Sequence, residues 1–296
     1  MTAVTRFAPS PTGYLHLGHA FSAWNAWIRA RTFGARTVGG RFLLRLEDID
    51  PQRCRPDYAA AIEEDLAWLG IDWDGPVRVQ SRHLDEYQAA LDTLQQQGLL
   101  YPCFCTRADI QREVATAASA PHGPDGAPLY AGTCRRLSPA QRAERIAAGE
   151  RFALRLDMQA ALRPGLSFHE EHEGRIPCHP ERFGDVVLGR KDVPASYHLC
   201  VTHDDALQGV ALVTRGADLK PATDLHRLLQ VLMGWPEPAY AHHHLLTDAS
   251  GRRLAKRDGA ATLRALRTAG VAAADIIERF SRDPGRSAAA SHLSIA

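Results

Sequence analysis

The sequence predicts an α/β fold in which a parallel sheet is interrupted by an inserted subdomain. Strand-like and helix-like patterns alternate through the first 100 residues, and a strand–helix–strand order implies parallel strands joined by right-handed crossovers. The alternation stops near Tyr101, where three of the six cysteines fall within 32 residues, and it resumes near Gly184. With 296 residues, 45% of them hydrophobic, the chain is long enough to bury such a core.

The individual elements are predicted from hydrophobic periodicity and from the residues that stop each run. In the first part we expect a strand at Val4–Ala8, a loop at Pro9–Gly13, a helix at about 17–33, a strand at Arg41–Glu47, and helices at about 56–69 and 84–97. In the rest we expect a loop at 121–128, a helix at about 138–148, strand-like pieces such as Arg151–Met158, strands at Tyr197–His203 and Val210–Arg215, and a helix at Ala222–Met233.

The composition excludes several classes of protein. A formal net charge of +1 argues against a general nucleic-acid coat, because nonspecific phosphate binding needs a clear basic excess. No run of about 18 apolar residues is present, so we expect no membrane span. The N-terminus lacks the charged-then-apolar layout of a secretory signal. We therefore expect a cytoplasmic protein, and no obligate protein partner is evident.

The charge is nevertheless uneven along the chain. Residues 51–100 hold four basic and nine acidic side chains, whereas 251–296 hold nine basic and four acidic ones. A basic end on a nearly neutral protein fits a phosphate-bearing partner that is bound at one place. A solvated, arginine-rich helix surface explains the same pattern equally well.

The tetrapeptide His16-Leu17-Gly18-His19 lies where a loop is expected to enter a helix. Histidines three residues apart share one face of a helical turn, and the amides and dipole of a helix N-terminus already favour anions. Two imidazoles at this place would bind phosphate oxygens, and Gly18 would let a flat ring approach the backbone. Taken alone, the motif is more often a pair of ordinary histidines.

A basic loop lies near the other end of the chain, between two glycines, with the sequence RRLAKRD. The chain has 3 lysines among its 35 basic residues, so a lysine inside an arginine cluster suggests a need for a compact, mobile ammonium. Such a group could follow charge as it moves between phosphates. A solvated basic loop remains the ordinary alternative.

Four segments together resemble a class I aminoacyl-tRNA synthetase of the glutamyl branch. They are RFAPSPTGYLHLGHA, LLRLEDID, VTRGADL and RLAKR, and they span about Thr5 to Gly259. The resemblance implies a Rossmann-type catalytic domain that activates an amino acid with ATP and Mg²⁺. In the lysine motif Lys256 matches the catalytic lysine, while Arg253 and Arg257 replace the family's first lysine and final serine.

The resemblance also implies the roles of individual residues. His16, His19 and Lys256 would be catalytic, and these three together with Gly18 would bind ATP. The substrate L-glutamate would be bound by Arg6, Ala8, Ser10, Glu47, Tyr197 and Arg215. The chemistry agrees, because guanidinium groups suit the two carboxylates and Glu47 suits the ammonium. Without the motifs, surface ion pairing would explain these charged residues.

We expect the chain to divide into four regions. Residues 1–100 and 184–260 would be the two halves of the catalytic domain, the second including the lysine loop. Residues 101–183 would be an inserted zinc-bearing subdomain, and residues 261–296 a short helical tail. Only 37 residues follow Gly259, so we expect no anticodon-binding domain.

The clustered cysteines suggest a metal site. Cys103, Cys105 and Cys134 offer three thiolates, and tetrahedral zinc needs a fourth ligand, for which chemistry alone favours His122. The pattern C-x-C…Y-x-x-x-C resembles the structural Zn²⁺ site of the glutamyl-Q branch of the family, and this resemblance implies Tyr130 instead. Three buried thiols without metal are the alternative. The other cysteines, Cys54, Cys178 and Cys200, show no ligand spacing.

Resemblance to the glutamyl-Q branch implies a particular acceptor. Enzymes of this truncated branch transfer activated glutamate to the queuosine base at the wobble position of tRNA(Asp). The nearest alternative is a compact glutamyl- or glutaminyl-tRNA synthetase that charges a tRNA 3′ end. Another nucleotidyltransferase with the histidine motif, or an inactive paralogue that only binds, would explain fewer of the residues.

Overall fold

The computed structural model describes residues 4–34, 40–116, 122–246 and 261–282. Its strands are β1 (Val4–Phe7), β2 (Arg41–Leu46), β3 (Arg78–Val79), β4 (Leu100–Cys103), β5 (Ala153–Leu156), β6 (Ser167–Glu170), β7 (Gly174–Pro177), β8 (Val187–Gly189), β9 (Leu212–Gly216) and β10 (Ala239–His243). Its α-helices are α1 (Leu17–Gly34), α2 (Pro56–Trp68), α3 (Leu84–Gln96), α4 (Arg107–Thr116), α5 (Pro139–Ala147), α6 (Met158–Ala161), α7 (Tyr197–Leu207), α8 (Ala222–Met233), α9 (Leu263–Thr268) and α10 (Ala273–Arg282). Short 3₁₀ turns are η1 (Gln80–Arg82), η2 (Thr133–Arg136), η3 (Pro180–Phe183) and η4 (Ala217–Leu219).

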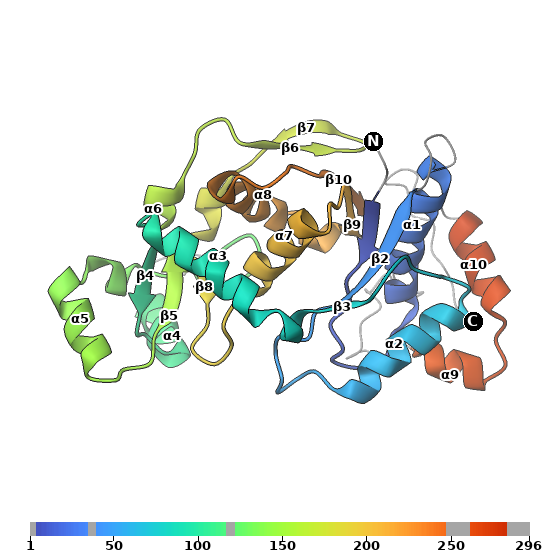
Figure 1. Ribbon diagram of the computed structural model, residues 1–296, viewed down its shortest axis with the longest axis horizontal. Helices are drawn as coiled ribbons and strands as arrows, with labels where there is room; N and C mark the ends of the chain where they lie inside the picture. The colour runs from blue at the N-terminus through green and yellow to red at the C-terminus, as the bar shows by residue number, and fades with distance from the viewer. Residues whose placement is uncertain (1–3, 35–39, 117–121, 247–260, 283–296) are drawn as a thin grey trace.

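Two groups of parallel strands meet edge to edge, which confirms the predicted α/β fold (Figure 1). Strands β1, β2 and β3 pair in parallel, and β9, β10 and β6 also pair in parallel, with β7 antiparallel at the far edge. Strand β1 lies beside β9, where the Ala211 amide donates to the Val4 carbonyl at 2.9 Å. The carboxyl ends of β1, β2, β9 and β10 therefore open toward one place, where open α/β sheets usually bind ligands.

A separate antiparallel sheet, β4–β5–β8, carries the cysteines at one end of the molecule (Figure 1). Buried Tyr101, Cys103, Phe104 and Cys134 form its small core. The sheet does not follow the sequence order simply. Strand β8 belongs to it, whereas β6 and β7, which precede β8 in the chain, extend the sheet of β9 and β10.

One predicted strand is wrong. Residues 197–203 begin the helix α7 and do not form a strand. The Ser196 hydroxyl accepts a hydrogen bond from the Leu199 amide at 3.5 Å and so caps the new helix. Buried Leu199, Cys200 and Val201 occupy successive positions, a run that resembles a buried strand when it is taken without its cap.

The last described segment is tied to the histidine motif. Thr262 forms a backbone bridge with His16, and the Leu263 amide donates to the Leu15 carbonyl at 2.8 Å. Helices α9 and α10 then pack against α2 and α1, where buried Leu263 and Phe280 join the core of the first half-sheet (Figure 1). No helix among the described residues is long and apolar enough to cross a membrane.

Candidate active site

A cavity of about 510 Å³ opens at the carboxyl ends of the parallel strands. It gathers every predicted catalytic, ATP-binding and glutamate-binding residue that the structure describes, namely Arg6, Ala8, Ser10, His16, Gly18, His19, Glu47, Tyr197 and Arg215. They come from β1 and its loop, the start of α1, the end of β2, α7 and β9. Lys256 lies outside the described residues, six positions before Thr262, whose backbone pairs with His16.

The two histidines of the motif lie against each other with a defined proton arrangement. Their rings are stacked, with centroids 3.8 Å apart. The Nδ1 atom of His16 accepts from the Gly18 amide at 3.1 Å, and the Nδ1 atom of His19 accepts from the His16 amide at 3.2 Å. Because each neutral imidazole carries one proton, both rings hold it on Nε2, and both Nε2–H groups are donors.

Gly18 lets the His16 ring lie against its backbone. A Cβ atom at this position would lie 2.9 Å from Cε1 of His16, closer than real Cβ contacts allow. The space above the Gly18 backbone is thus filled by the His16 ring, which folds back to accept the Gly18 amide. The absence of a side chain at Gly18 permits this orientation of His16, and the hydrogen bond from the Gly18 amide holds it.

Buried ion pairs join the two halves of the sheet beneath the cavity. Arg6 forms a two-point ion pair with Asp205, at 2.9 and 3.2 Å, and also donates to the Thr214 carbonyl. Fully buried Arg45 donates to the same Asp205 carboxylate at 2.7 Å. Although burial alone would raise it, the pKa of Asp205 is lowered by these two guanidinium groups. Arg6 thus lines the cavity while it holds β1 to α7.

Glu47 is a buried carboxylate with spare bonding capacity. One of its oxygens has no hydrogen-bond partner, and the nearest charge is the Arg45 Nε at 3.6 Å. Burial raises the pKa of Glu47 to about 7, against the opposing effect of Arg45 and Arg6. A buried carboxylate that lines the cavity, and whose ion pair with Arg45 is as long as 3.6 Å, favours a further cationic group.

Arg215 is a buried cation whose hydrogen-bond partners among the described residues are all neutral. It donates to the Thr223 hydroxyl at 2.7 Å, to His226 at 3.1 Å and to His242 at 3.2 Å. No carboxylate in the described part of the chain forms an ion pair with it. Since a buried charge is costly unless it is paired, Arg215 is suited to bind an incoming carboxylate.

The surrounding histidines are held neutral. Burial lowers the pKa of His226 well below its usual value, and the charge of Arg215 lowers it further. Burial likewise lowers the pKa of His242, although its bond to Glu170 opposes the shift. A guanidinium only donates, so each ring accepts from Arg215 and must donate from its other nitrogen. These neighbours orient Arg215 without neutralising its charge.

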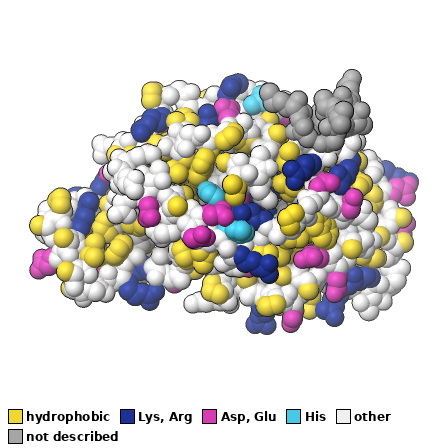
Figure 2. All heavy atoms as spheres, viewed as in Figure 1, with side chains coloured by type: hydrophobic (Ala, Val, Ile, Leu, Met, Phe, Trp, Pro, Cys, Tyr) yellow, Lys and Arg dark blue, Asp and Glu magenta, His cyan; other side chains and the backbone are white. Residues whose placement is uncertain are grey.

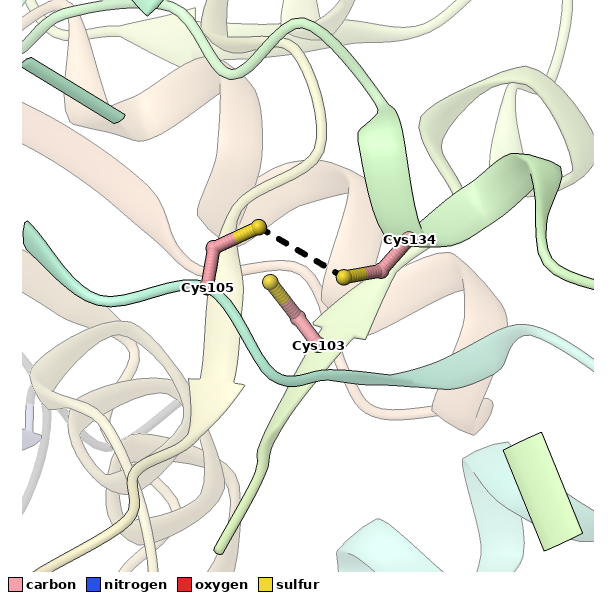
Figure 3. A group of neighbouring side chains, drawn as sticks. All are labelled: Cys103, Cys105 and Cys134. Carbon is pink, nitrogen blue, oxygen red and sulfur yellow. Dashed lines mark hydrogen bonds between the residues drawn. The ribbon is translucent and has the colours of Figure 1, made fainter. Parts of the chain in front are cut away.

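The three predicted thiols converge at the other end of the molecule (Figure 3). The sulfurs of Cys103, Cys105 and Cys134 all lie within 4.8 Å of one another, and those of Cys105 and Cys134 are 3.5 Å apart. The Tyr130 hydroxyl is 3.4 Å from the Cys105 sulfur and accepts from the Cys134 amide at 2.7 Å. Three thiols this close together could hold a metal ion, and the Tyr130 hydroxyl lies beside them.

His122 does not join the cluster. It pairs with Pro128 through the backbone and lines a separate cavity beside Phe168 and Lys220. No histidine or carboxylate of the described residues lies with the three thiols. Of the two candidate fourth ligands, Tyr130 is therefore the one that lies beside the sulfurs.

The sequence did not single out the residues that organise the site from behind. They are Arg45, Glu170, Asp205, His226 and His242. A signal existed for Arg45, because it interrupts the apolar run of a strand whose residues 42–46 are all buried. Asp205 is a buried acid in a helix interior, which also requires a cationic partner.

Comparison with known proteins agrees with this geometry. The family model described as tRNA synthetases class I (E and Q), catalytic domain, matches residues 2–285. A glutamyl-Q tRNA(Asp) synthetase of Rhodobacter capsulatus is 48% identical over 281 residues, which cover 92% of this chain and 98% of that protein. The corresponding protein of Nitratidesulfovibrio vulgaris is 46% identical, with 92% and 83% covered.

A solved structure gives the same fold. The glutamate tRNA ligase of Elizabethkingia meningosepticum, in complex with its amino acid, superimposes with a TM-score of 0.74 at 28% identity. The match covers 88% of this chain and 53% of that one, so the chain spans about half the length of this solved relative.

Proposed function

The chain belongs to the family of class I tRNA synthetases for glutamate and glutamine, and we propose from this membership that it is a glutamyl-Q tRNA(Asp) synthetase. It activates L-glutamate with ATP and transfers it to the queuosine base at the wobble position of tRNA(Asp). The observation that carries the proposal is the single cavity that unites Arg215, Glu47 and the two histidines. We assign the work of this ligase to the cytoplasm, where tRNA is charged.

Glutamate is recognised by charge. Its side-chain carboxylate binds Arg215, whose hydrogen-bond partners among the described residues are uncharged. Its ammonium binds the carboxylate of Glu47, which lines the same cavity. Tyr197 orients a carboxylate through its phenol, which stays protonated because burial raises its pKa. Ala8 and Ser10 complete the wall, and Arg6 supports it through Asp205.

The first step forms glutamyl-AMP. An oxygen of the glutamate α-carboxylate bonds to the α-phosphorus of ATP, and pyrophosphate leaves. No general base is needed, because the carboxylate is already ionised. The Nε2–H groups of His16 and His19, and the ammonium of Lys256, stabilise the charge that develops on the phosphates. Mg²⁺ bound to those phosphates would neutralise part of the same charge.

The second step transfers the glutamyl group. A hydroxyl oxygen of queuosine bonds to the acyl carbon of glutamyl-AMP, AMP leaves, and the hydroxyl proton is released as the ester forms. The protein contributes mainly by holding the adenylate and the RNA in reach of each other. Figure 2 shows basic and acidic side chains interspersed with apolar ones on one face of the molecule.

The comparisons favour this acceptor over a tRNA 3′ end. Relatives named glutamyl-Q tRNA(Asp) synthetase reach 48% and 46% identity, and the chain covers 98% and 83% of their lengths. A glutamate–tRNA ligase of Acidithiobacillus ferrooxidans is 42% identical, and the chain covers 58% of it.

Two assays test the proposed function. We expect glutamate-dependent ATP–pyrophosphate exchange, with little exchange for glutamine or aspartate, because only glutamate satisfies both Arg215 and Glu47. We then expect radiolabelled glutamate to enter queuosine-bearing tRNA(Asp). Transfer to tRNA(Glu) in place of tRNA(Asp) would contradict the assignment, and so would binding of ATP without exchange.

The raised pKa of Glu47 predicts a pH dependence. As the pH falls below about 7, Glu47 takes up a proton and loses the charge that binds the ammonium. We expect kcat/KM for glutamate to fall by up to about tenfold per pH unit below that value. In E47Q the activity should be lower and this slope should vanish. An unchanged slope in E47Q, measured by exchange between pH 5.5 and 8.5, would exclude Glu47 as the titrating group.

We propose that Cys103, Cys105, Tyr130 and Cys134 hold a structural Zn²⁺. The converging sulfurs and the adjacent phenol support this assignment. Four protein ligands leave no open position for substrate, so the ion would act by holding the β4–β5 edge to η2.

Metal analysis tests the zinc site. We expect about one equivalent of zinc in the purified protein, with loss of the metal and a lower melting temperature in C134S. Y130F should retain zinc but release it faster to a chelator. C178S is the matched control, because Cys178 is a thiol outside the cluster. Equal zinc content in C134S and C178S would refute the assignment.

For the organisation of the chain we propose the four regions 1–100, 101–183, 184–260 and 261–296. The pairing of β4 with β5 supports an insertion that starts near residue 101. The β6–β7 hairpin, although it falls within 101–183, extends the second half-sheet by pairing with β10.

A further inference from the structure

A second cavity, of about 390 Å³, lies between α4, the strand β5 and the start of α7. Its lining shares no residue with the first cavity, which contains Arg215 and Glu47 and is called the glutamate cavity below. Ile110, Leu129 and Phe183 give it apolar walls, and Arg107 and Arg155 give it cationic groups. Two carboxylates line it as well, Asp125 and Asp185, of which Asp185 is already ion-paired with Arg135 at 3.1 Å. The two cavities are nevertheless neighbours, because Tyr197 lines one and His198 lines the other.

Arg155 in this cavity resembles Arg215 in the glutamate cavity. It is 8% exposed, it donates to the Asp185 carbonyl at 2.6 Å, and its Nε atom has no hydrogen-bond partner. Within the described ranges no carboxylate forms an ion pair with it. A buried cation with this spare capacity is suited to an anionic ligand. Its guanidinium also stacks on the Tyr130 ring at 4.0 Å, so it touches the thiol cluster as well.

His198 adds a donor whose proton position is fixed. His226 accepts from Arg215 at Nδ1 and therefore donates from Nε2 to Nδ1 of His198, at 3.1 Å. The proton of His198 must then be on Nε2, the ring nitrogen that His226 does not use. These hydrogen bonds run from Arg215 in one cavity to His198 in the other.

We propose that this second cavity binds a nucleoside of the RNA substrate adjacent in the strand to the one that receives glutamate. The nucleoside that accepts glutamate must itself reach the glutamate cavity. A nucleoside that occupies the second cavity, which His198 lines, must therefore be the next one along the RNA strand. A base face suits the apolar walls, and its phosphate suits Arg107 and Arg155. An extruded, single-stranded base is the form in which loops of RNA are recognised in pockets. The inference rests on the function proposed above.

Two variants test the site without touching the thiol cluster or the glutamate cavity. I110W fills the cavity from α4, and R107Q removes a cation from its rim. R112Q is the matched control, because Arg112 lies on the same helix, is 76% exposed and does not line the cavity. Each variant is measured by glutamate-dependent exchange without RNA, by transfer to queuosine-bearing tRNA(Asp) over a salt series, and by zinc content.

We expect I110W to keep its exchange activity and zinc while kcat/KM for the tRNA falls about tenfold or more. R107Q should raise KM for the tRNA and reduce the salt slope by about 1, whereas R112Q should do neither. Normal transfer in I110W would overturn the proposal, as would an equal loss of exchange and transfer. If the wild type performs exchange but no transfer to this tRNA, the proposed function fails first and the cavity proposal falls with it.

Discussion

Replacing Arg215 by glutamine is expected to lower kcat/KM for glutamate by about 10²- to 10³-fold in ATP–pyrophosphate exchange. The reason is that this guanidinium has neutral hydrogen-bond partners, so the substrate carboxylate is its counter-charge. The kcat/KM for glutamine should fall far less in this variant, because the neutral side-chain amide of glutamine does not form an ion pair with Arg215. The ratio of the two kcat/KM values is therefore the decisive measurement.

Two further observations separate recognition from folding. R215K keeps the charge but not the planar fork, so it should recover only part of the loss. The melting temperature of R215Q should be recorded alongside, because the variant also loses its bond to Thr223. If kcat/KM fell by the same factor for glutamate and for glutamine, Arg215 would have a structural role in the sheet and would not recognise the substrate carboxylate.

Replacing His19 by alanine is expected to slow adenylate formation by about 10²- to 10³-fold, with little change in glutamate binding. Its Nε2–H is the donor offered to the phosphates, since Nδ1 is occupied by the His16 amide. H19Q should lose less, because the glutamine amide can present an N–H near the same position. Single-turnover formation of glutamyl-AMP measures the step directly.

His172 supplies the matched control for this variant. It is an exposed histidine on the turn between β6 and β7, and its side chain is 63% exposed. H172A should behave as the wild type in adenylate formation. Should H19A form glutamyl-AMP at the wild-type rate, the histidine motif would have no part in the chemistry and the assignment of His19 would be withdrawn.

Local pattern predicted the elements and the motifs well, because periodicity and stop residues are properties of neighbouring residues. The helix at 222–233 and the strand that begins at Arg41 lie where periodicity put them. The misassigned segment 197–203 contains a run of buried residues, and a short apolar run has the same sequence pattern in a buried strand as in a buried helix. Its cap at Ser196 was the signal that could have decided the matter.

Contacts between distant parts of the chain could not be predicted in the same way. The motif identified Arg6, yet nothing near it in sequence indicates that Asp205 takes both ends of its guanidinium. The neutral groups around Arg215 come from α8 and β10. They lie beside Arg215 only once β9 and β10 have paired, so their sequence positions alone do not indicate this contact. The thiol cluster was predicted by spacing, whereas Tyr130 was preferred to His122 only through the family resemblance, because ligand chemistry alone favoured His122; in the structure it is Tyr130 that lies beside the sulfurs.

The ion pairs between the half-sheets also bear on how the molecule folds. Arg6 and Asp205 are 199 positions apart, and closing so long a loop costs chain entropy that only later contacts offset. The floor of the glutamate cavity should therefore form late in folding and open early in unfolding. A ligand that binds only the native state adds about 2.7 kcal/mol to the free energy of unfolding when its concentration is a hundred times its Kd. Besides being the substrate, bound glutamate should therefore slow unfolding and lengthen the lifetime of the native state.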